Sequence, residues 1–436
     1  MDAPNTPQPI DGKDKFTGKR LVLLSSESSF NQASEEAKNS SLRLANSLDY
    51  QSDTNNYKKA FQDADGIVFE RFGVAVINEN HEDQIKNLTA SASSRQTFLY
   101  TEPERYLYAL TPAQMTLWQR ICAIFFPPKR NPGAPIQTPE PPLQKPPSYR
   151  DDATAYWGLH ATKVLESSFT GKGINLAILD TGFNTEHPDF QGRSITTASF
   201  VESEPPNDLN GHGTHCAGIA AGDTNRENNI RYGVAKDANL YIGKVLSNEG
   251  TGSDSGILAG LEWAIQNNCK IVSMSLGGSV QKGESYSRIY NDLANKLMAQ
   301  GMIIIAAAGN DSRRNSGIIR PVSHPANCPA IMAVGALDQE MAIADFSCAG
   351  INTDGGEINV AAPGVAVYSA YRAPQLHQML SGTSMATPFV SGIAALLWEE
   401  FPEESPEGIW SKIQQYALEV GLPSSDVGSG LARAVS

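Results

Sequence analysis

The sequence lacks the features that mark zinc-binding, disulfide-rich and membrane-spanning proteins. Its 436 residues include only five cysteines, and no two of them form a CxxC pair, which argues against a zinc site. An odd number of cysteines at irregular spacing is not a disulfide framework, so we expect buried free thiols, with a Cys328–Cys348 pair as the alternative. No apolar run reaches the length of a membrane span.

An excess of positive charge is also missing. The chain has 34 Lys and Arg against 47 Asp and Glu, a formal net charge of −13. Such an acidic chain is a poor candidate for binding nucleic acid or an anionic membrane. Residues 1–20 contain no apolar signal segment, so we expect either an intracellular protein or a secreted one whose signal was removed.

The most informative stretch present is LSGTSMATPFVSGIAALLW, from Leu380 to Trp398. Ser384 stands among small residues, just before an apolar run. The pattern predicts a turn that places this serine on the first turn of a buried helix, where free N–H groups favour negative charge. A serine needs a positioned base to become a nucleophile. Two earlier stretches offer partners: ILDTG holds Asp180, and NGHGTHCAG holds His212.

Five pieces of sequence, in this order, carry a family resemblance. They are LAILDTG around Asp180, GHGTHCAG around His212, SLGG from Ser275 to Gly278, AAAGN ending at Asn310, and GTSMATP around Ser384. On these motifs the chain resembles the subtilisin-like serine proteases. The resemblance implies a serine endopeptidase with the chain order Asp, His, Ser in its catalytic triad.

The resemblance also implies a role for each residue. Ser384 would be the nucleophile, His212 the general base and then acid, and Asp180 the group that orients the imidazole. The Asn310 side chain and the Ser384 backbone N–H would stabilise the oxyanion. The simpler alternatives, a helix N-cap serine and a turn asparagine, do not account for the flanking motifs.

Two short segments resemble those that bind the substrate backbone in this family. A peptide inserted between them would gain main-chain hydrogen bonds as an added β-strand. For the first segment, a flexible turn is the alternative. The predicted substrate-binding residues are Gly250, Thr251, Gly252, Ser275, Leu276 and Gly277.

Composition divides the chain into four parts. Residues 1–18 are expected to be a disordered leader. Residues 19–110 suggest a β-α-β-β-α-β order, with one helix running from Ser34 to Asp49, which fits a ferredoxin-like α+β sandwich. The resemblance implies an inhibitory propeptide cut after its last residue; an unrelated accessory domain is the alternative. Residues 111–150 form a Pro-rich linker that is itself a possible cleavage site.

Residues 151–436 alternate apolar strand patterns with helical patterns. The predicted strands are Ile174–Asp180, Leu240–Val245, Ile271–Leu276, Met302–Ala308 and Ile331–Val334. The predicted helices, besides the one that carries Ser384, are His212–Ala221, Ser255–Asn267, Tyr286–Gln300 and Ser405–Glu419. Nearly continuous apolar strands are typical of a parallel sheet buried on both faces. The expected fold class is therefore α/β, a doubly wound, mostly parallel sheet preceded by the small α+β domain. Asp180, Ser275 and Asn310 all fall at the C-terminal ends of predicted strands, where such sheets bind ligands.

The resemblance implies no cofactor for catalysis, but it raises the possibility of structural calcium. Asp189 resembles a calcium-ligand aspartate of the family. The loop Gly222–Tyr232 carries further oxygen ligands, and an ordinary polar loop is the alternative. These loop residues are Asp223, Glu227, Asn228 and Asn229.

The expected partners are protein or peptide substrates and the chain's own N-terminal domain as an intramolecular inhibitor. Two other functions remain open from the sequence: a catalytically silent peptide-binding module, and an acyl-transfer peptide ligase on the same fold.

Overall fold

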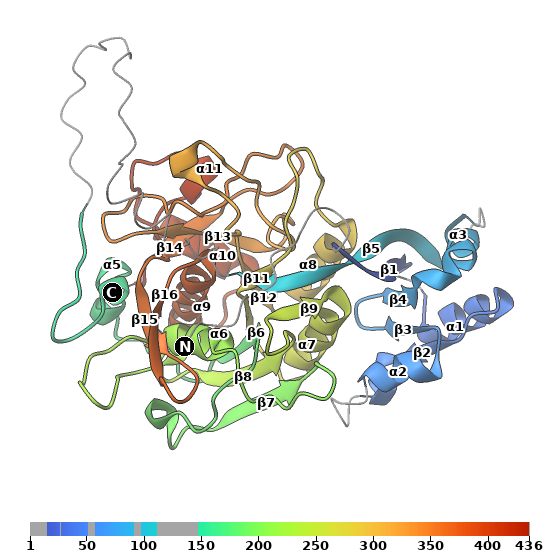
Figure 1. Ribbon diagram of the computed structural model, residues 1–436, viewed down its shortest axis with the longest axis horizontal. Helices are drawn as coiled ribbons and strands as arrows, with labels where there is room; N and C mark the ends of the chain where they lie inside the picture. The colour runs from blue at the N-terminus through green and yellow to red at the C-terminus, as the bar shows by residue number, and fades with distance from the viewer. Residues whose placement is uncertain (1–14, 27, 51–56, 91–96, 111–146, 436) are drawn as a thin grey trace, which may run out of the picture.

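The computed structural model describes residues 15–26, 28–50, 57–90, 97–110 and 147–435, and the structural statements below refer to these residues. A small N-terminal α+β unit and a large α/β unit lie side by side, and one long strand, β5, reaches from the first into the second (Figure 1). Residues 1–14 of the predicted leader and residues 111–146 of the predicted linker lie outside the described residues.

In its described residues the N-terminal unit has one sheet in the order β5-β1-β4-β3-β2 and three α-helices. Its strands are β1 (Phe16–Leu24), β2 (Leu44–Asn46), β3 (Gly66–Phe69), β4 (Val74–Asn78) and β5 (Phe98–Ala109). Its helices are α1 (Phe30–Asn39), α2 (Tyr57–Asp63) and α3 (Glu82–Ala90). Alternate strand residues face opposite sides. Val22 packs in the cluster with α1 and α3, and neighbouring Leu21 packs in the cluster shared with the large unit.

Two boundary predictions in this unit were wrong. The strand β1 begins at Phe16, inside the predicted leader, because its first residues pair with β5. The predicted helix over Ser34–Asp49 is instead α1, capped by Ser29 and ended at Asn39, followed by the strand β2. Ser41 adopts a left-handed φ of 62°, which reverses the chain where the sequence pattern had suggested continued helix.

The large unit contains a parallel sheet of seven strands in the order β14-β13-β12-β10-β6-β8-β7. The α/β class with a parallel sheet is thus confirmed. The strands are β6 (Asn175–Asp180), β7 (Ile195–Ser199), β8 (Asn239–Lys244), β10 (Ile271–Met274), β12 (Ile303–Ala307), β13 (Met332–Leu337) and β14 (Val360–Pro363). The patterns missed β7 and β14, whose residues are partly polar or small.

Helices cover both faces of this sheet (Figure 1). One face packs on α6 (His212–Ala221) and α9 (Thr383–Glu400), and the other on α7 (Asp254–Gln266) and α8 (Arg288–Ala299). The smaller elements are α5 (Trp157–Ala161), α10 (Pro406–Gln415), α11 (Ser424–Val427), β15 (Val367–Ala370) and β16 (His377–Leu380). None of the helices in the described ranges combines the length and hydropathy needed to cross a membrane.

The strand β5 lies between two strands of the large unit, β9 (Thr251–Ser253) and β11 (Leu276–Gly277), and is antiparallel to both. The N-terminal sheet then packs on α7 and α8, and residues of both units form one apolar cluster. Burial of apolar surface of this kind stabilises the association of the two units.

Four of the five cysteines are described, and each is buried and free: Cys216, Cys269, Cys328 and Cys348. The expectation of free thiols is confirmed for them, and the alternative Cys328–Cys348 pair does not form. Cys122 lies outside the described residues.

Candidate active site

Asp180 and His212 meet at the C-terminal edge of the parallel sheet. Asp180 ends β6 and His212 begins α6, and their Oδ1 and Nδ1 atoms are 2.8 Å apart. The Thr181 N–H donates to the same carboxylate oxygen at 2.7 Å. Burial disfavours the charged imidazole, but the Asp180 carboxylate, together with the Cys216 side chain, outweighs it, so the pKa of His212 lies well above its ordinary value. The pair can therefore hold a proton on the imidazole.

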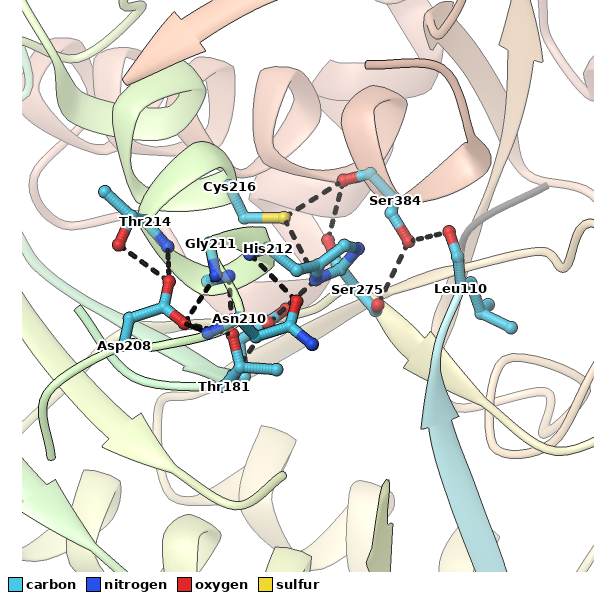
Figure 2. A network of polar contacts seen from close by, with 12 residues as sticks. Leu110, Thr181, Asp208, Asn210, Gly211, His212, Thr214, Cys216, Ser275 and Ser384 are labelled. Carbon is cyan, nitrogen blue, oxygen red and sulfur yellow. Dashed lines mark hydrogen bonds and ion pairs between the residues drawn. The ribbon is translucent and has the colours of Figure 1, made fainter. Parts of the chain in front are cut away.

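Ser384 lies on the first turn of α9, as the sequence predicted. Its hydroxyl lies 2.7 Å from the Leu110 carbonyl oxygen and 3.0 Å from that of Ser275 (Figure 2). The Nε2 atom of His212 is buried and has no hydrogen-bond partner among the described residues. In this state the serine donates to Leu110, the residue that follows β5, instead of to the histidine. Bonds between nucleophile and base are often long until the reacting complex forms.

The Asn310 side chain points at the same carbonyl. Its Nδ2 donates to the Leu110 oxygen at 2.7 Å, and its Oδ1 accepts from the N–H and the hydroxyl of Thr383, each at 2.9 Å. The Thr383 donors fix which way the amide points. A Cβ on Gly382 would stand 3.0 Å from the Leu110 oxygen, so glycine leaves room for the carbonyl. Two donors, Ser384 Oγ and Asn310 Nδ2, therefore converge on one peptide oxygen.

The two predicted substrate segments flank β5. Gly252 and Thr251 pair with Leu107 and Tyr108 on one side, and the Gly250 carbonyl accepts the Ala109 N–H at 2.8 Å. Leu276 and Gly277 pair with Ala109 and Tyr108 on the other side, and the Ser275 carbonyl accepts the Leu110 N–H at 3.4 Å. The structure thus brings all six predicted residues together around an extended segment of the chain itself.

Asp208 supports the site, although the sequence reasoning missed it. This buried carboxylate accepts the N–H of Gly211 at 2.8 Å and the N–H and hydroxyl of Thr214 at 2.9 and 2.7 Å. It also accepts the Thr181 hydroxyl at 3.0 Å. It thereby ties the loop before α6 to the end of β6, the two segments that carry His212 and Asp180. An aspartate shortly before a helix is a recognisable capping signal.

Cys216 lies one helical turn after His212. Its Sγ is 3.9 Å from His212 Nδ1 and donates to the Ser384 carbonyl at 3.5 Å. Burial raises the pKa of this thiol. It therefore packs against His212 and Ser384 as a neutral thiol.

Asp189, the predicted calcium ligand, is surrounded by hydrogen-bond donors. Its carboxylate accepts from the Arg226 N–H at 3.1 Å, the Tyr232 hydroxyl at 3.0 Å and His377 Nε2 at 2.8 Å. The nearest metal-competent neighbours are His187 and His377, and none of the predicted loop ligands joins them within the described residues. Two of the predicted loop ligands have local partners: Asn228 Oδ1 accepts the Ile230 N–H at 2.9 Å, and Asp223 Oδ1 accepts the Thr224 hydroxyl at 3.1 Å.

Comparison with known protein families places the same residues within one family domain. A model described as the subtilase family matches residues 171–430. This range holds Asp180, His212, Asn310 and Ser384. The chain belongs to the subtilase family. It is a subtilisin-like serine endopeptidase, a hydrolase.

Relatives within the family are similar over about 60% of the chain. The "Thermostable alkaline protease" of Halalkalibacterium halodurans is 40% identical over 285 residues, covering 64% of this chain and 73% of the relative. "Subtilisin DY" of Bacillus licheniformis is 38% identical over 264 residues, covering 60% of this chain and 90% of the relative. "Subtilisin E" of Bacillus subtilis is 36% identical over 265 residues, covering 60% of this chain and 65% of the relative. Subtilases need no cofactor for catalysis, and their substrates are proteins.

Proposed function

We propose that this subtilase cleaves peptide bonds with Asp180, His212 and Ser384 as its triad and Asn310 in its oxyanion hole, and that it is made as a self-inhibited zymogen. One observation carries the proposal. The carbonyl of Leu110, at the end of an extended segment held between two strands, lies 2.7 Å from both Ser384 Oγ and Asn310 Nδ2. A substrate carbonyl must occupy this position for the serine to attack it.

The mechanism follows from the positions of these groups. Ser384 Oγ attacks the carbonyl carbon while His212 Nε2, which is free in this state, accepts its proton. Asp180 holds the proton on Nδ1 and stabilises the imidazolium that forms. Asn310 Nδ2 and the Ser384 N–H donate to the oxyanion. His212 then protonates the leaving amine. In the second half-reaction His212 accepts a proton from water, the water attacks the acyl carbon, and Ser384 leaves as His212 returns the proton to it.

The N-terminal unit, residues 19–110, is proposed to be a propeptide-like inhibitor on a ferredoxin-like sandwich. Its sheet order supports this topology, with β2 and α2 as additions to the basic pattern. Two glutamates of β5 dock it on helix N-termini. Glu102 accepts the Arg288 N–H of α8 and Glu104 accepts the Ser255 N–H of α7, each at 2.8 Å. Carboxylates at these positions stabilise the helix ends and the association of the two units.

We propose that the N-terminal unit begins with β1 at Phe16, that residues 111–150 are a linker, and that residues 151–436 are the catalytic domain. Cleavage follows Leu110 or falls within the linker.

Mass spectrometry of products separates the proposed hydrolase from the alternatives. Hydrolysed peptides that require Ser384 support the proposal, cyclised or ligated peptides favour a ligase, and unchanged peptides favour a silent binding module.

Replacing Asn310 with alanine should lower kcat by about 10²- to 10³-fold and leave KM little changed, because the amide acts mainly on the oxyanion. Peptide hydrolysis by the purified variant measures both constants. Asn359→Ala is a control outside the proposed site; its Oδ1 accepts the Ala333 N–H instead. A loss confined to KM would contradict the oxyanion role.

Calcium at Asp189 is not part of the proposed function, because three protein donors already occupy this carboxylate and imidazoles are poor calcium ligands. The His187 ring nitrogens are also used, one toward the Leu376 carbonyl and one by the Asp189 N–H. We expect the melting temperature to stay unchanged when EDTA or millimolar calcium is added to the inactive Ser384→Ala chain, which prevents autolysis. A calcium-dependent rise that Asp189→Asn abolishes would contradict this.

A further inference from the structure

The contacts of β5 continue beyond the last strand pair, at Arg105. With Leu110 as the residue before the scissile bond (P1), Arg105 is the sixth residue (P6). The last pair between β5 and β9 is Tyr106 with Ser253. At the next residue the Arg105 N–H donates to Asp254 Oδ2 at 2.7 Å. A side-chain carboxylate therefore takes over where the backbone ladder ends.

The Asp254 carboxylate also has a partner within the large unit, His324. Asp254 is fully buried at the first position of α7, and its Oδ1 lies 3.1 Å from His324 Nε2. Burial holds the pKa of His324 below its ordinary value, so the neutral ring donates to the carboxylate. The Tyr290 ring packs edge-on against the His324 ring at 4.7 Å. This acceptor would remain in position if the N-terminal unit left.

The Arg105 side chain points to a second carboxylate of the large unit. Its Nη2 lies 3.8 Å from Glu284 Oε1, and its Nη1 lies 3.8 Å from Glu102 Oε2 of its own strand. Glu284 also pairs with Lys15 at 2.7 Å. Burial opposes ionisation of Glu284, but these cations hold its pKa below the ordinary value. Departure of the N-terminal unit would remove Lys15, Glu102 and Arg105 together and leave Glu284 without either cation.

We propose that the substrate cleft of this protease extends to P6 and selects lysine or arginine there, with Asp254 binding the backbone N–H and Glu284 binding the side chain. This inference rests on the proposed function, because it assumes that substrates follow the path of β5. The chemistry favours a peptide with a basic residue five positions before its P1 residue. A carboxylate bound to a backbone N–H is a strong, charge-assisted hydrogen bond. The ion pair between the buried Arg105 and the partly exposed Glu284 adds discrimination between side chains.

The test uses protein expressed as the full chain and allowed to mature, with active sites titrated by a fluorophosphonate. Internally quenched peptides carry Tyr-Leu-Tyr-Ala-Leu at P5 to P1 and Arg, Lys, Gln or Glu at P6. We expect kcat/KM for Arg and Lys to exceed that for Gln by about 3- to 5-fold. Glu284→Gln should remove this preference, so that the Arg, Lys and Gln peptides are cleaved with similar kcat/KM. Glu419→Gln, an exposed glutamate following α10, is the matched control and should keep the preference.

A peptide N-methylated at the P6 nitrogen tests Asp254 without a mutation that could disturb α7. Loss of the N–H should lower kcat/KM by about 10-fold or more. Equal cleavage of the Arg and Gln peptides, a preference that survives Glu284→Gln, or an N-methyl peptide cut at the normal rate would overturn the extended cleft. If the wild-type protein cuts none of the peptides, the proposed function itself fails, which is a different result from cleavage without P6 discrimination.

Discussion

The full chain carrying Ser384→Ala should stay intact, whereas the wild-type chain should be cut at Leu110 or within residues 111–150. The serine hydroxyl is the proposed nucleophile and lies 2.7 Å from the Leu110 carbonyl oxygen, so its removal stops cleavage at that carbonyl. Removing the nucleophile from a subtilisin lowers kcat by about 10⁶-fold. N-terminal sequencing and intact mass of the two purified proteins, with fluorophosphonate labelling of the active serine, measure the effect.

Ser391→Ala is the matched control for this experiment. Ser391 is a buried serine of the same helix, α9, and its hydroxyl donates to the Thr387 carbonyl at 3.1 Å, away from the Leu110 carbonyl. The control should be processed and labelled like the wild type. A purified Ser384→Ala chain that is still cut near Leu110 would show that maturation needs another protease or another nucleophile.

The second large effect is expected from Asp180→Asn. Loss of the carboxylate removes the group that holds the imidazole tautomer and stabilises the imidazolium, and it should lower kcat by about 10⁴-fold. The pH profile should change as well. His212 must be neutral to accept the Ser384 proton, so activity falls as the pH drops through the His212 pKa. Asp180 raises this pKa. The acid limb of the wild-type profile, where kcat/KM falls with decreasing pH, should therefore have an apparent pKa above the ordinary histidine value.

In Asp180→Asn the burial of the ring would act without the opposing charge, so the His212 pKa should fall and the acid limb should move to lower pH. The dependence of kcat/KM on pH in both proteins measures this shift. Asp223→Asn, in the loop that follows α6, is the control and should leave the limb in place. An unmoved acid limb in Asp180→Asn would contradict the assigned pairing of Asp180 with His212.

Much of the large unit could be predicted because its signals are local. Long apolar runs at β6, β10 and β12 can only be buried on both faces, and the range predicted for the helix that begins at His212 matches α6. The prediction failed where local pattern and tertiary context disagree. The stretch Leu44–Asn46 has a helical pattern, but pairing with β3 makes it a strand, because the sheet satisfies its backbone hydrogen bonds.

The sequence alone determined the family, and it predicted the site residues Asp180, His212, Asn310 and Ser384, because each is carried by a short contiguous motif. It could not determine what occupies the substrate cleft. Insertion of β5 between β9 and β11, the two donors on the Leu110 carbonyl and the meeting of Arg105 with Asp254 and Glu284 join residues far apart in the chain. Such contacts depend on how two units pack, and only the tertiary structure decides them.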